Sequence, residues 1–446
     1  MNEAGSARGE SPVGLRRVVA LREGEGAAVA WAFVYLFALI GSFYVLRPIR
    51  EEMGIRGGVN QLQWLFTGTF AVMLAAIPAY SALVARVPRS RAVPVVYAVF
   101  AACLLAFSVV FRADLWRVEA ARAFFVWMSV YNLFVVAVFW SLMADLFTSE
   151  QGKRLFGLVA GGGSAGALAG SAVTGSLVGV AGIANLVLAA LGLLALAAFC
   201  SRRLSAWARR EGRGVAVGAG REDPLGGSPW SGFTTVVRSP YLLGTAALMF
   251  LFTLGSTFLY FQQARIVAAA IPESARRTAL FAAVDFAVNV GALGLQSLAT
   301  GRIAMAFGLL PALSVVPILT TGGFVSLAIA PTLVTIAVVI CLRRIAEYAL
   351  QRPARDVLFT VVSRDEKYKA KGFIDTVVYR GGDALSGWLF TLLTGLGLST
   401  RELSLSAVPV AALSLGVGVW LARPHAARER TAERAAAEHA AVEVVS

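Results

Sequence analysis

Two short strings share one pattern of charge and place it beside long apolar segments. Positions 47–51 read Arg-Pro-Ile-Arg-Glu and positions 352–356 read Arg-Pro-Ala-Arg-Asp. Each string stands at the C-terminal end of a segment long enough to cross a membrane. Because charge beside hydrocarbon is costly, ionisable groups found there usually mark the path of a substrate or ion. Guanidinium groups bind carboxylates and phosphates through paired hydrogen bonds, so the strings predict an anion-binding site.

The first string leaves two interpretations open. Arg47 and Arg50 are three residues apart, so on a helix they face the same way. Pro48 between them favours a local break in that helix, which would expose backbone carbonyls. Either the two arginines hold a phosphate or carboxylate of a substrate, or they cap the outer end of the helix, paired with Glu51 and Glu52.

Three charged residues fall inside a later apolar segment. Arg343 and Arg344 are followed by Glu347, which either arginine could reach along one helix face. One arginine is left over, and an unpaired arginine at that depth needs a water-filled cavity or an anion.

Two further polar pairs have helical spacing. Arg380 and Asp383 can close on one face, as a structural ion pair or as a gating pair. Asp285 and Asn289 are one turn apart, as a proton or counter-ion site or as a polar packing contact. The predicted substrate-binding residues are Arg47, Arg50, Arg343, Arg344, Arg355 and Arg380, and those for gating or coupling are Glu51, Asp285, Asn289, Asp356, Asp375 and Asp383.

A glycine-rich run at 161–166 satisfies the G-x-G-x-x-G pattern of dinucleotide-binding proteins. No strand precedes it, so that function is not predicted. Small residues instead let membrane helices approach closely, and we interpret the run as a packing face. Its members are Gly161, Gly162, Gly163, Gly166 and Gly170.

The composition indicates an all-α membrane protein. Of 446 residues, 58% are hydrophobic and 15% are charged, with a mean hydropathy of +0.72, whereas soluble domains carry about 25% charged residues. The cations behind the net charge of +14 concentrate in alternate loops, which predicts cytoplasmic N- and C-termini. We expect the protein to lie in a bacterial inner membrane. Nucleic-acid binding is not expected, because no recognition module is visible.

Runs of apolar residues predict twelve transmembrane helices. They divide the chain into a cytoplasmic N-terminal tail (1–26), a six-helix bundle (27–201), a flexible linker (202–239), a second six-helix bundle (240–422) and a cytoplasmic C-terminal tail (423–446). Two six-helix halves around a cavity form the layout of the major facilitator superfamily. The predicted spans are 27–46, 61–85, 92–111, 123–147, 155–178, 182–201, 240–262, 277–299, 304–328, 332–351, 373–397 and 404–422.

Signals for catalysis, metals and cofactors are absent from the sequence. The two histidines lie in the C-terminal tail, the three cysteines have no metal spacing, and no Gly-Lys-Ser/Thr phosphate loop occurs. We therefore expect no enzyme, no metal and no cofactor, and any transport must be secondary. The expected partners are a small anionic substrate and the lipid bilayer, and we expect a monomer.

Four strings resemble the plastid and bacterial ATP/ADP translocase family, in the same order over most of the chain. They are 45–51, the segment from Phe139-Trp140 through 150–157, the string 352–356 and the run from Asp365 to Asp375. The resemblance implies twelve-helix antiporters that exchange ATP for ADP or other nucleotides without a P-loop. Arg50 and Arg355 stand where family members carry important lysines.

The sequence also departs from that family. Its functional glutamates in spans four and seven align near Met128 and Phe261, where no acid occurs and Gln262 is the nearest polar residue. Two other hypotheses therefore stay open. One is a proton-coupled carrier for another organic anion or a drug-like solute, with Asp285 or Asp383 taking the proton. The other is a non-transporting membrane scaffold or sensor, which predicts internally paired charges and no cavity.

Overall fold

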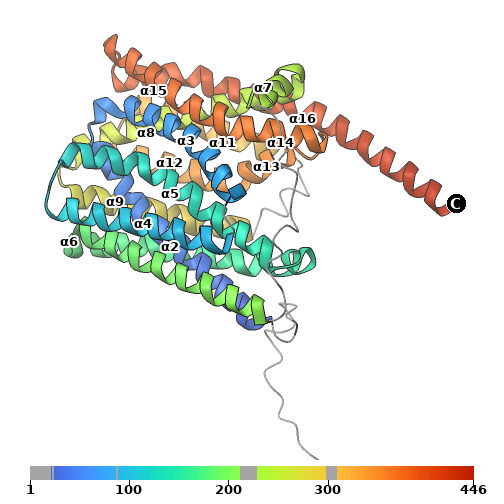
Figure 1. The fold of residues 1–446 in the computed structure, drawn as a ribbon. Coiled ribbons are helices and arrows are strands. Elements are labelled where there is room, and N and C mark those ends of the chain that lie inside the picture. Colours follow the sequence, from blue (N-terminus) through green and yellow to red (C-terminus); the bar gives the residue numbers. More distant parts are fainter. Residues whose placement is uncertain (1–21, 23–24, 87–88, 211–228, 298–308, 446) are drawn as a thin grey trace, which may run out of the picture.

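The computed structural model describes residues 22, 25–86, 89–210, 229–297 and 309–445, and within these ranges every regular element is a helix (Figure 1). This confirms the predicted all-α class. Eight of the described helices are long and apolar enough to cross a membrane. The count of twelve spans is not confirmed and stays a prediction.

The first five long helices form an N-terminal set, and four of them, α2, α4, α5 and α6, share a hydrophobic core. Because most of their faces are apolar, each helix can be buried on one side and covered by lipid on the other. The members are α2 (Gly26–Arg56), α3 (Leu62–Arg86), α4 (Arg89–Arg112), α5 (Arg117–Leu146) and α6 (Ser149–Arg210), with a short 3₁₀ turn η1 (Val59–Gln61) after α2.

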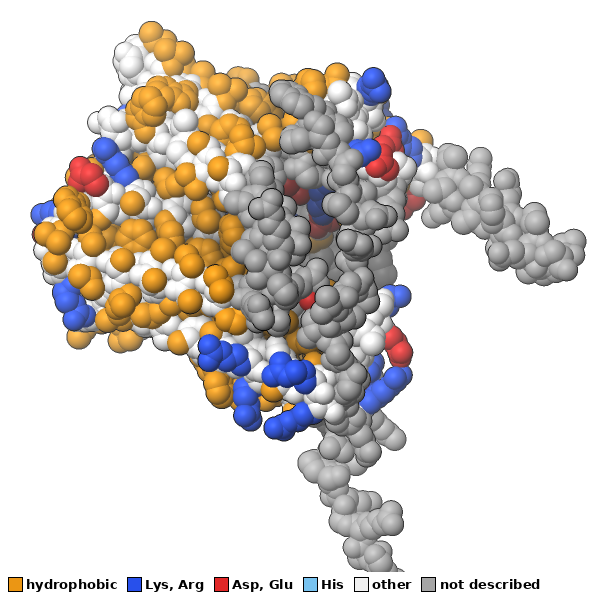
Figure 2. All heavy atoms as spheres, in the orientation of Figure 1, with side chains coloured by type: hydrophobic (Ala, Val, Ile, Leu, Met, Phe, Trp, Pro, Cys, Tyr) orange, Lys and Arg blue, Asp and Glu red, His pale blue; other side chains and the backbone are white. Residues whose placement is uncertain are grey.

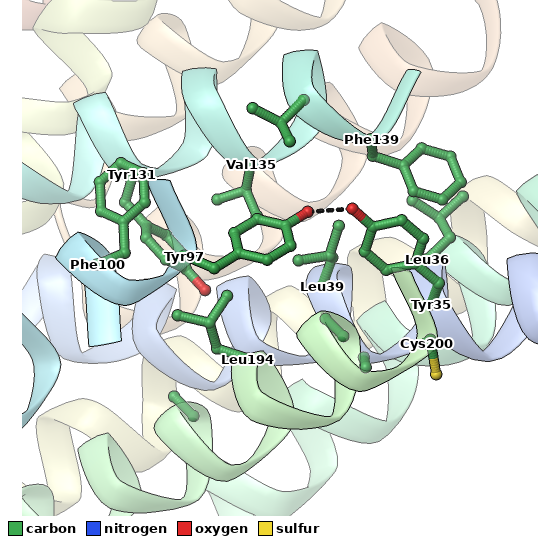
Figure 3. Close-up of a cluster of buried hydrophobic side chains, with 14 of the residues drawn as sticks. Tyr35, Leu36, Leu39, Tyr97, Phe100, Tyr131, Val135, Phe139, Leu194 and Cys200 are labelled. Carbon is green, nitrogen blue, oxygen red and sulfur yellow. Dashed lines mark hydrogen bonds between the residues drawn. The ribbon is translucent and has the colours of Figure 1, made fainter. Parts of the chain in front are cut away.

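Large aromatic side chains fill this core. Tyr35 of α2 and Tyr97 of α4 point their hydroxyls at each other and share a hydrogen bond, while Phe139 of α5 packs edge-on against Tyr35 (Figure 3). A buried hydroxyl costs free energy unless it is hydrogen-bonded. The tyrosine pair therefore fixes how α2 and α4 meet.

The remaining helices form a C-terminal set around two further cores. One of these cores also takes in Ile55, Leu62, Leu65 and Phe125 of the N-terminal set, so the two sets are in contact there. The members are α7 (Pro229–Arg238), α8 (Pro240–Ala270), α9 (Ser274–Leu295), α11 (Leu309–Ile329), α12 (Leu333–Ala346), a π-helical turn η3 (Glu347–Gln351), α13 (Arg352–Val357), α14 (Arg364–Phe373), a second π-helical turn η4 (Ile374–Val378), α15 (Tyr379–Gly395) and α16 (Thr400–Val445).

The surface agrees with a membrane environment. Figure 2 shows a broad hydrophobic face over the long helices, with lysine, arginine and acidic side chains gathered towards the helix ends. Exposed apolar side chains such as Val180, Val334 and Leu392 are more than half accessible. An apolar face of this size would be unusual on a water-soluble monomer.

Several predicted boundaries are wrong, because helices continue past the apolar residues that signalled them. α2 runs through Pro48 to Arg56 without the expected break, and α13 carries the helical path through the second charged string. α6 joins the predicted fifth and sixth spans across a non-helical Gly182 and covers 202–210 of the predicted linker, while α7 covers 229–238. The rest of that linker, 211–228, lies outside the described residues, as do 1–21, and α16 has no boundary at 423.

A hydroxyl from α6 bonds to the backbone of α2 close to its proline. Pro48 leaves the carbonyl of Tyr44 without its usual amide donor. Thr174 of α6 donates to the neighbouring carbonyl of Val45 at 3.0 Å. Threonine side chains commonly satisfy such carbonyls in membrane helices.

Three glycines of the predicted packing face lie directly against α2. A Cβ atom at Gly162, Gly166 or Gly170 would overlap backbone oxygens of Phe33, Phe37 and Gly41, respectively. Their spacing of four residues puts all three on one side of α6. Of the other two, Gly163 faces side chains of α2 at 3.3 Å and Gly161 has a single neighbour at 3.8 Å.

We predict that Gly166→Ala destabilises the protein by roughly 1–3 kcal/mol, because the added methyl group forces α2 and α6 apart. Gly157→Ala is the matched control on the same helix, since nothing lies within 4 Å of its Cβ position. The measurement is the thermal unfolding midpoint of each purified variant. Equal midpoints for the two variants would contradict this account of the α2–α6 contact.

A polar cluster ties the start of α2 to the start of α6. The carboxylate of Glu25, which is 6% exposed, accepts hydrogen bonds from the Arg22 amide, Gln151 and Arg154 at 3.0, 2.8 and 2.7 Å. Burial alone would raise the pKa of Glu25, but these hydrogen bonds outweigh it and lower the pKa from 4.5 to about 2. The ionised carboxylate therefore stabilises this end of the N-terminal set.

The lowered pKa of Glu25 predicts a pH-dependent contribution to stability. A carboxylate with a depressed folded-state pKa stabilises fully above its unfolded pKa of 4.5 and loses the effect as pH falls towards about 2. Glu25→Gln should therefore lower the unfolding midpoint at pH 7, and the difference from the unmodified protein should shrink below about pH 4.5. A difference that stays constant between pH 7 and pH 3 would argue against this assignment.

Candidate substrate-binding site

A cavity of about 220 Å³ lies between the two sets of helices, and most of the predicted charged residues line it. Its walls come from α2 and α3 on one side and from α8, α9, α12, η3 and α15 on the other. These charges are concentrated where two bundles meet rather than spread over helix ends. The ionisable lining residues with formal charge are Arg47, Arg50, Glu51, Asp285, Arg343, Arg344, Glu347, Arg380 and Asp383.

One carboxylate in this cavity is shared by two arginines. Nη2 of Arg344 donates to Oδ1 of Asp285 at 2.7 Å, and Nη1 of Arg47 lies 3.5 Å from the same oxygen. The side chains of Arg47, Arg344 and Asp285 are 18%, 15% and 3% exposed. Two buried positive charges therefore face one negative charge.

Arg47 is the less satisfied of the two arginines. Its guanidinium makes no hydrogen bond to any residue that the structure describes. The central carbon of that guanidinium lies 5.5 Å from the ring centroid of Tyr44. Oδ2 of Asp285 and Nε of Arg344 are buried without a hydrogen-bond partner in the same part of the chain. Buried polar groups normally have partners, so this corner of the cavity is suited to an anion.

Arg343 points away from that corner and is fully engaged. It donates to the hydroxyls of Thr320 (3.1 Å) and Ser256, and its guanidinium lies 4.8 Å from the ring of Phe252. Its ion pair with Glu347, at 3.8 Å, is long. Arg343 therefore joins α8, α11 and α12 and leaves little capacity for a ligand.

The structure decides which arginine pairs with Glu347. Either Arg343 or Arg344 could reach Glu347 by spacing, but only Arg343 does so, and Arg344 pairs with Asp285. Successive helix residues point about 100° apart, so the two arginines face different neighbours.

Two more arginines of the cavity have nearby acids. Arg50 lies 3.3 Å from Glu51 and its guanidinium stacks 3.9 Å from the ring of Phe125. Arg380 lies 3.7 Å from Asp383. Arg50 and Arg380 both line the cavity, so Arg50 lies beside Arg47 in a cavity wall while it also pairs with Glu51.

A second cavity of about 240 Å³ adjoins the first and shares Glu347 and Tyr379 with it. It contains the candidates Arg355, Asp356 and Asp375, together with Arg352 and Lys371. The candidates are thus divided between two neighbouring cavities.

Arg355 has no carboxylate partner among the described residues. It contacts the sulfur of Met249 at 2.9 Å and the ring of Phe252 at 4.9 Å, whereas Asp356 pairs with Lys371 at 2.7 Å. Asn289 lines neither of these two cavities, and its amide nitrogen is buried without a partner.

No local pattern in the sequence indicated the doubly hydrogen-bonded ion pair between α2 and α9. Arg277 of α9 donates two hydrogen bonds to Glu52 of α2, at 2.6 and 2.7 Å, and two more to the carbonyls of Ile271 and Pro272. Glu52 is fully buried. Trp388 adds a hydrogen bond to Thr67 on α3 at 3.0 Å. These contacts close one end of the interface between the sets.

Neutral polar residues of α8 also went unnoticed. Thr257 donates to Asp383 at 2.9 Å, and Ser256, Tyr260 and Gln263 line the first cavity. They lie in a helix that is otherwise apolar, so hydropathy alone gives them no weight. Their spacing of three to four residues puts them on one face of α8, and that spacing could have identified a polar face from the sequence.

Solved structures show the same fold. A POT family transporter in complex with a thioalcohol-conjugated peptide is 12% identical and covers 88% of this chain and 95% of its own, with a TM-score of 0.63. A bacterial homologue of the iron transporter ferroportin is 12% identical, covers 90% and 100%, and has a TM-score of 0.63. The nucleoside transporter NupG is 14% identical, covers 90% and 99%, and has a TM-score of 0.56.

The fold is therefore of the major facilitator type, as the sequence predicted. At these identities the likeness concerns the fold alone. No family model and no curated protein matches the sequence.

We predict that Arg277→Gln destabilises the protein by roughly 3 kcal/mol, because it leaves the buried carboxylate of Glu52 without a counter-charge. The double variant Glu52→Gln/Arg277→Gln should recover part of that loss, since no buried charge then remains unpaired. Arg276→Gln is the matched control, because its side chain is 75% exposed and pairs only at the surface. Thermal unfolding of all three variants tests this, and a double variant less stable than Arg277→Gln would refute it.

Proposed function

We propose that this protein is a secondary transporter that moves a small organic anion by alternating access between two helical bundles. The observation that carries the proposal is the surplus of positive charge at Arg47, Arg344 and Asp285, inside a cavity between the two sets. An uncompensated arginine surrounded by hydrocarbon needs an anion or water. Cavities between bundles are also where such transporters bind their substrates.

A phosphorylated substrate of the nucleotide type fits the site best. The four strings that resemble ATP/ADP translocases include Arg50 and Arg355, one in each of the two adjoining cavities. Guanidinium groups match phosphate geometry. Aromatic side chains for stacking a base are present in the first cavity, among them Phe66, Tyr260 and Tyr348.

Exchange, rather than one-way transport, follows from the same charges. An empty carrier would have to reorient with Arg355 lacking a counter-anion and with Arg47 and Arg344 sharing one, which is costly in a membrane. A bound anion removes that cost in either direction. On this view the protein is an ATP:ADP-type antiporter of the bacterial inner membrane, with bundles at 27–201 and 240–422, and works as a monomer.

A second candidate function rests on Asp383. This carboxyl group is buried in the first cavity, hydrogen-bonded to Thr257 and only loosely paired with Arg380. A carrier for another organic anion could take up a proton there. The scaffold hypothesis predicted internally paired charges, which Arg343, Arg344 and Arg380 have. It has less support because it also predicted no cavity, whereas one lies between the two sets.

Nucleotide exchange in proteoliposomes tests the proposal. Vesicles loaded with ATP should take up labelled ADP, and empty vesicles should not. Arg47→Ala should weaken uptake roughly tenfold to a hundredfold, the value of one to two hydrogen bonds to a charged group. Arg276→Ala, an exposed arginine outside the cavity, should behave like the unmodified protein.

The outcomes separate the candidates. Uptake that follows a pH gradient and ignores internal nucleotide would favour the proton-coupled carrier. Full activity in Arg47→Ala would exclude this arginine as the anion site, and with it the observation on which the proposal rests.

A further inference from the structure

We propose that Asp285 is a resident counter-anion, which holds Arg47 in the empty protein and competes with the anionic group of the substrate for that arginine. This inference rests on the proposed function and adds to it the residue that sets substrate affinity. The contact between Arg47 and Asp285 joins the two helical sets, and an incoming anion can replace Asp285 in that contact.

The partners of Asp285 divide unequally between the two sets. The short hydrogen bond of 2.7 Å joins it to Arg344, and both residues belong to the C-terminal set. The longer contact of 3.5 Å reaches Arg47 of α2 in the N-terminal set, with no hydrogen bond. The contact across the interface is therefore the weaker of the two.

The neighbouring acids of the cavity are arranged differently. Glu51, Glu347 and Asp383 each lie within 4 Å of one arginine, respectively Arg50, Arg343 and Arg380. Asp285 alone among the described cavity carboxylates lies within 4 Å of two. The local surplus of one positive charge is thus confined to the place where Asp285 sits.

Burial makes this surplus consequential. Asp285 is 2% exposed, both arginine contacts are made to its Oδ1, and its Oδ2 is buried without a hydrogen-bond partner. Charges separated by a few ångströms in such surroundings interact much more strongly than in water. A carboxylate or phosphate whose oxygens accept hydrogen bonds from Arg47 would satisfy N–H donors that Asp285 leaves unused.

The charge count predicts how substitutions change anion binding. The unmodified trio carries a net charge of +1, and Asp285→Asn raises it to +2. Arg47→Gln lowers it to zero, and combining Arg47→Gln with Asp285→Asn returns it to +1. If Asp285 competes with the substrate, anion affinity is highest in Asp285→Asn (+2), intermediate in the unmodified protein and the double variant (+1), and lowest in Arg47→Gln (0).

The test measures the thermal unfolding midpoint of the purified full-length protein against the concentration of inorganic pyrophosphate, with ADP in parallel. Pyrophosphate carries the charge without a base, so it reports on the arginines alone. In Asp285→Asn the half-saturating concentration should fall about tenfold or more. Glu273→Gln, which removes an exposed carboxylate outside the cavity, should leave it unchanged.

A second comparison does not depend on the stability of Asp285→Asn alone. Arg47→Gln should lose binding of pyrophosphate, and adding Asp285→Asn to it should restore binding. A merely structural Asp285 predicts the opposite, because a second substitution would then weaken the protein further. Failure of Asp285→Asn to tighten binding, or failure of the double variant to regain it, would overturn the inference.

The outcome is separable from that of the proposed function. If Asp285→Asn binds pyrophosphate more tightly than the unmodified protein does, and the unmodified protein exchanges no nucleotide, Asp285 is the counter-anion and the substrate is a different anion. If nucleotide exchange occurs and Asp285→Asn binds no more tightly, the transporter stands and this inference fails.

Discussion

The cost of charge in hydrocarbon governs this structure. Nine ionised side chains line one cavity between the two helical sets, and each must find an opposite charge, a hydrogen bond or water. The contact of Arg47 and Arg344 with Asp285 meets that need while joining α2 to α9 and α12. Helix packing elsewhere, such as the contact of the α6 glycines with α2, fixes the position of the helix that carries Arg47 and Arg50.

The sequence predicted the class of fold and most of the charged residues that line the cavity. Hydropathy required membrane helices, and the rarity of charge within apolar segments singled out Arg343, Arg344 and Asp285. Partners were harder to predict, because local spacing offers only neighbours one turn away. Arg344 is 59 residues from Asp285 in the sequence, and Arg277 is 225 residues from Glu52. Such pairs depend on how the helices pack, which no local pattern contains.

Helix ends were missed for a related physical reason. A hydropathy pattern stops at the first charged residues, whereas a helix stops where its backbone hydrogen bonds stop. α2 therefore continues through Arg47 and Arg50 to Arg56. This continuation keeps both arginines within α2, where they line the cavity between the two sets.

Two contacts between α2 and α9 differ in a way that bears on movement. Glu52 and Arg277 are joined by two short hydrogen bonds, whereas Arg47 and Asp285 are 3.5 Å apart. Losing one partner of a buried pair is costly, but hydrating both together recovers much of the desolvation free energy. Separating α2 from α9 at Glu52 and Arg277 would therefore cost less if both groups entered water together. In the empty protein, Arg47 and Arg344 share the single negative charge of Asp285. An anion that binds there would supply the missing negative charge and so stabilise the two arginines, without affecting the pair of Glu52 and Arg277.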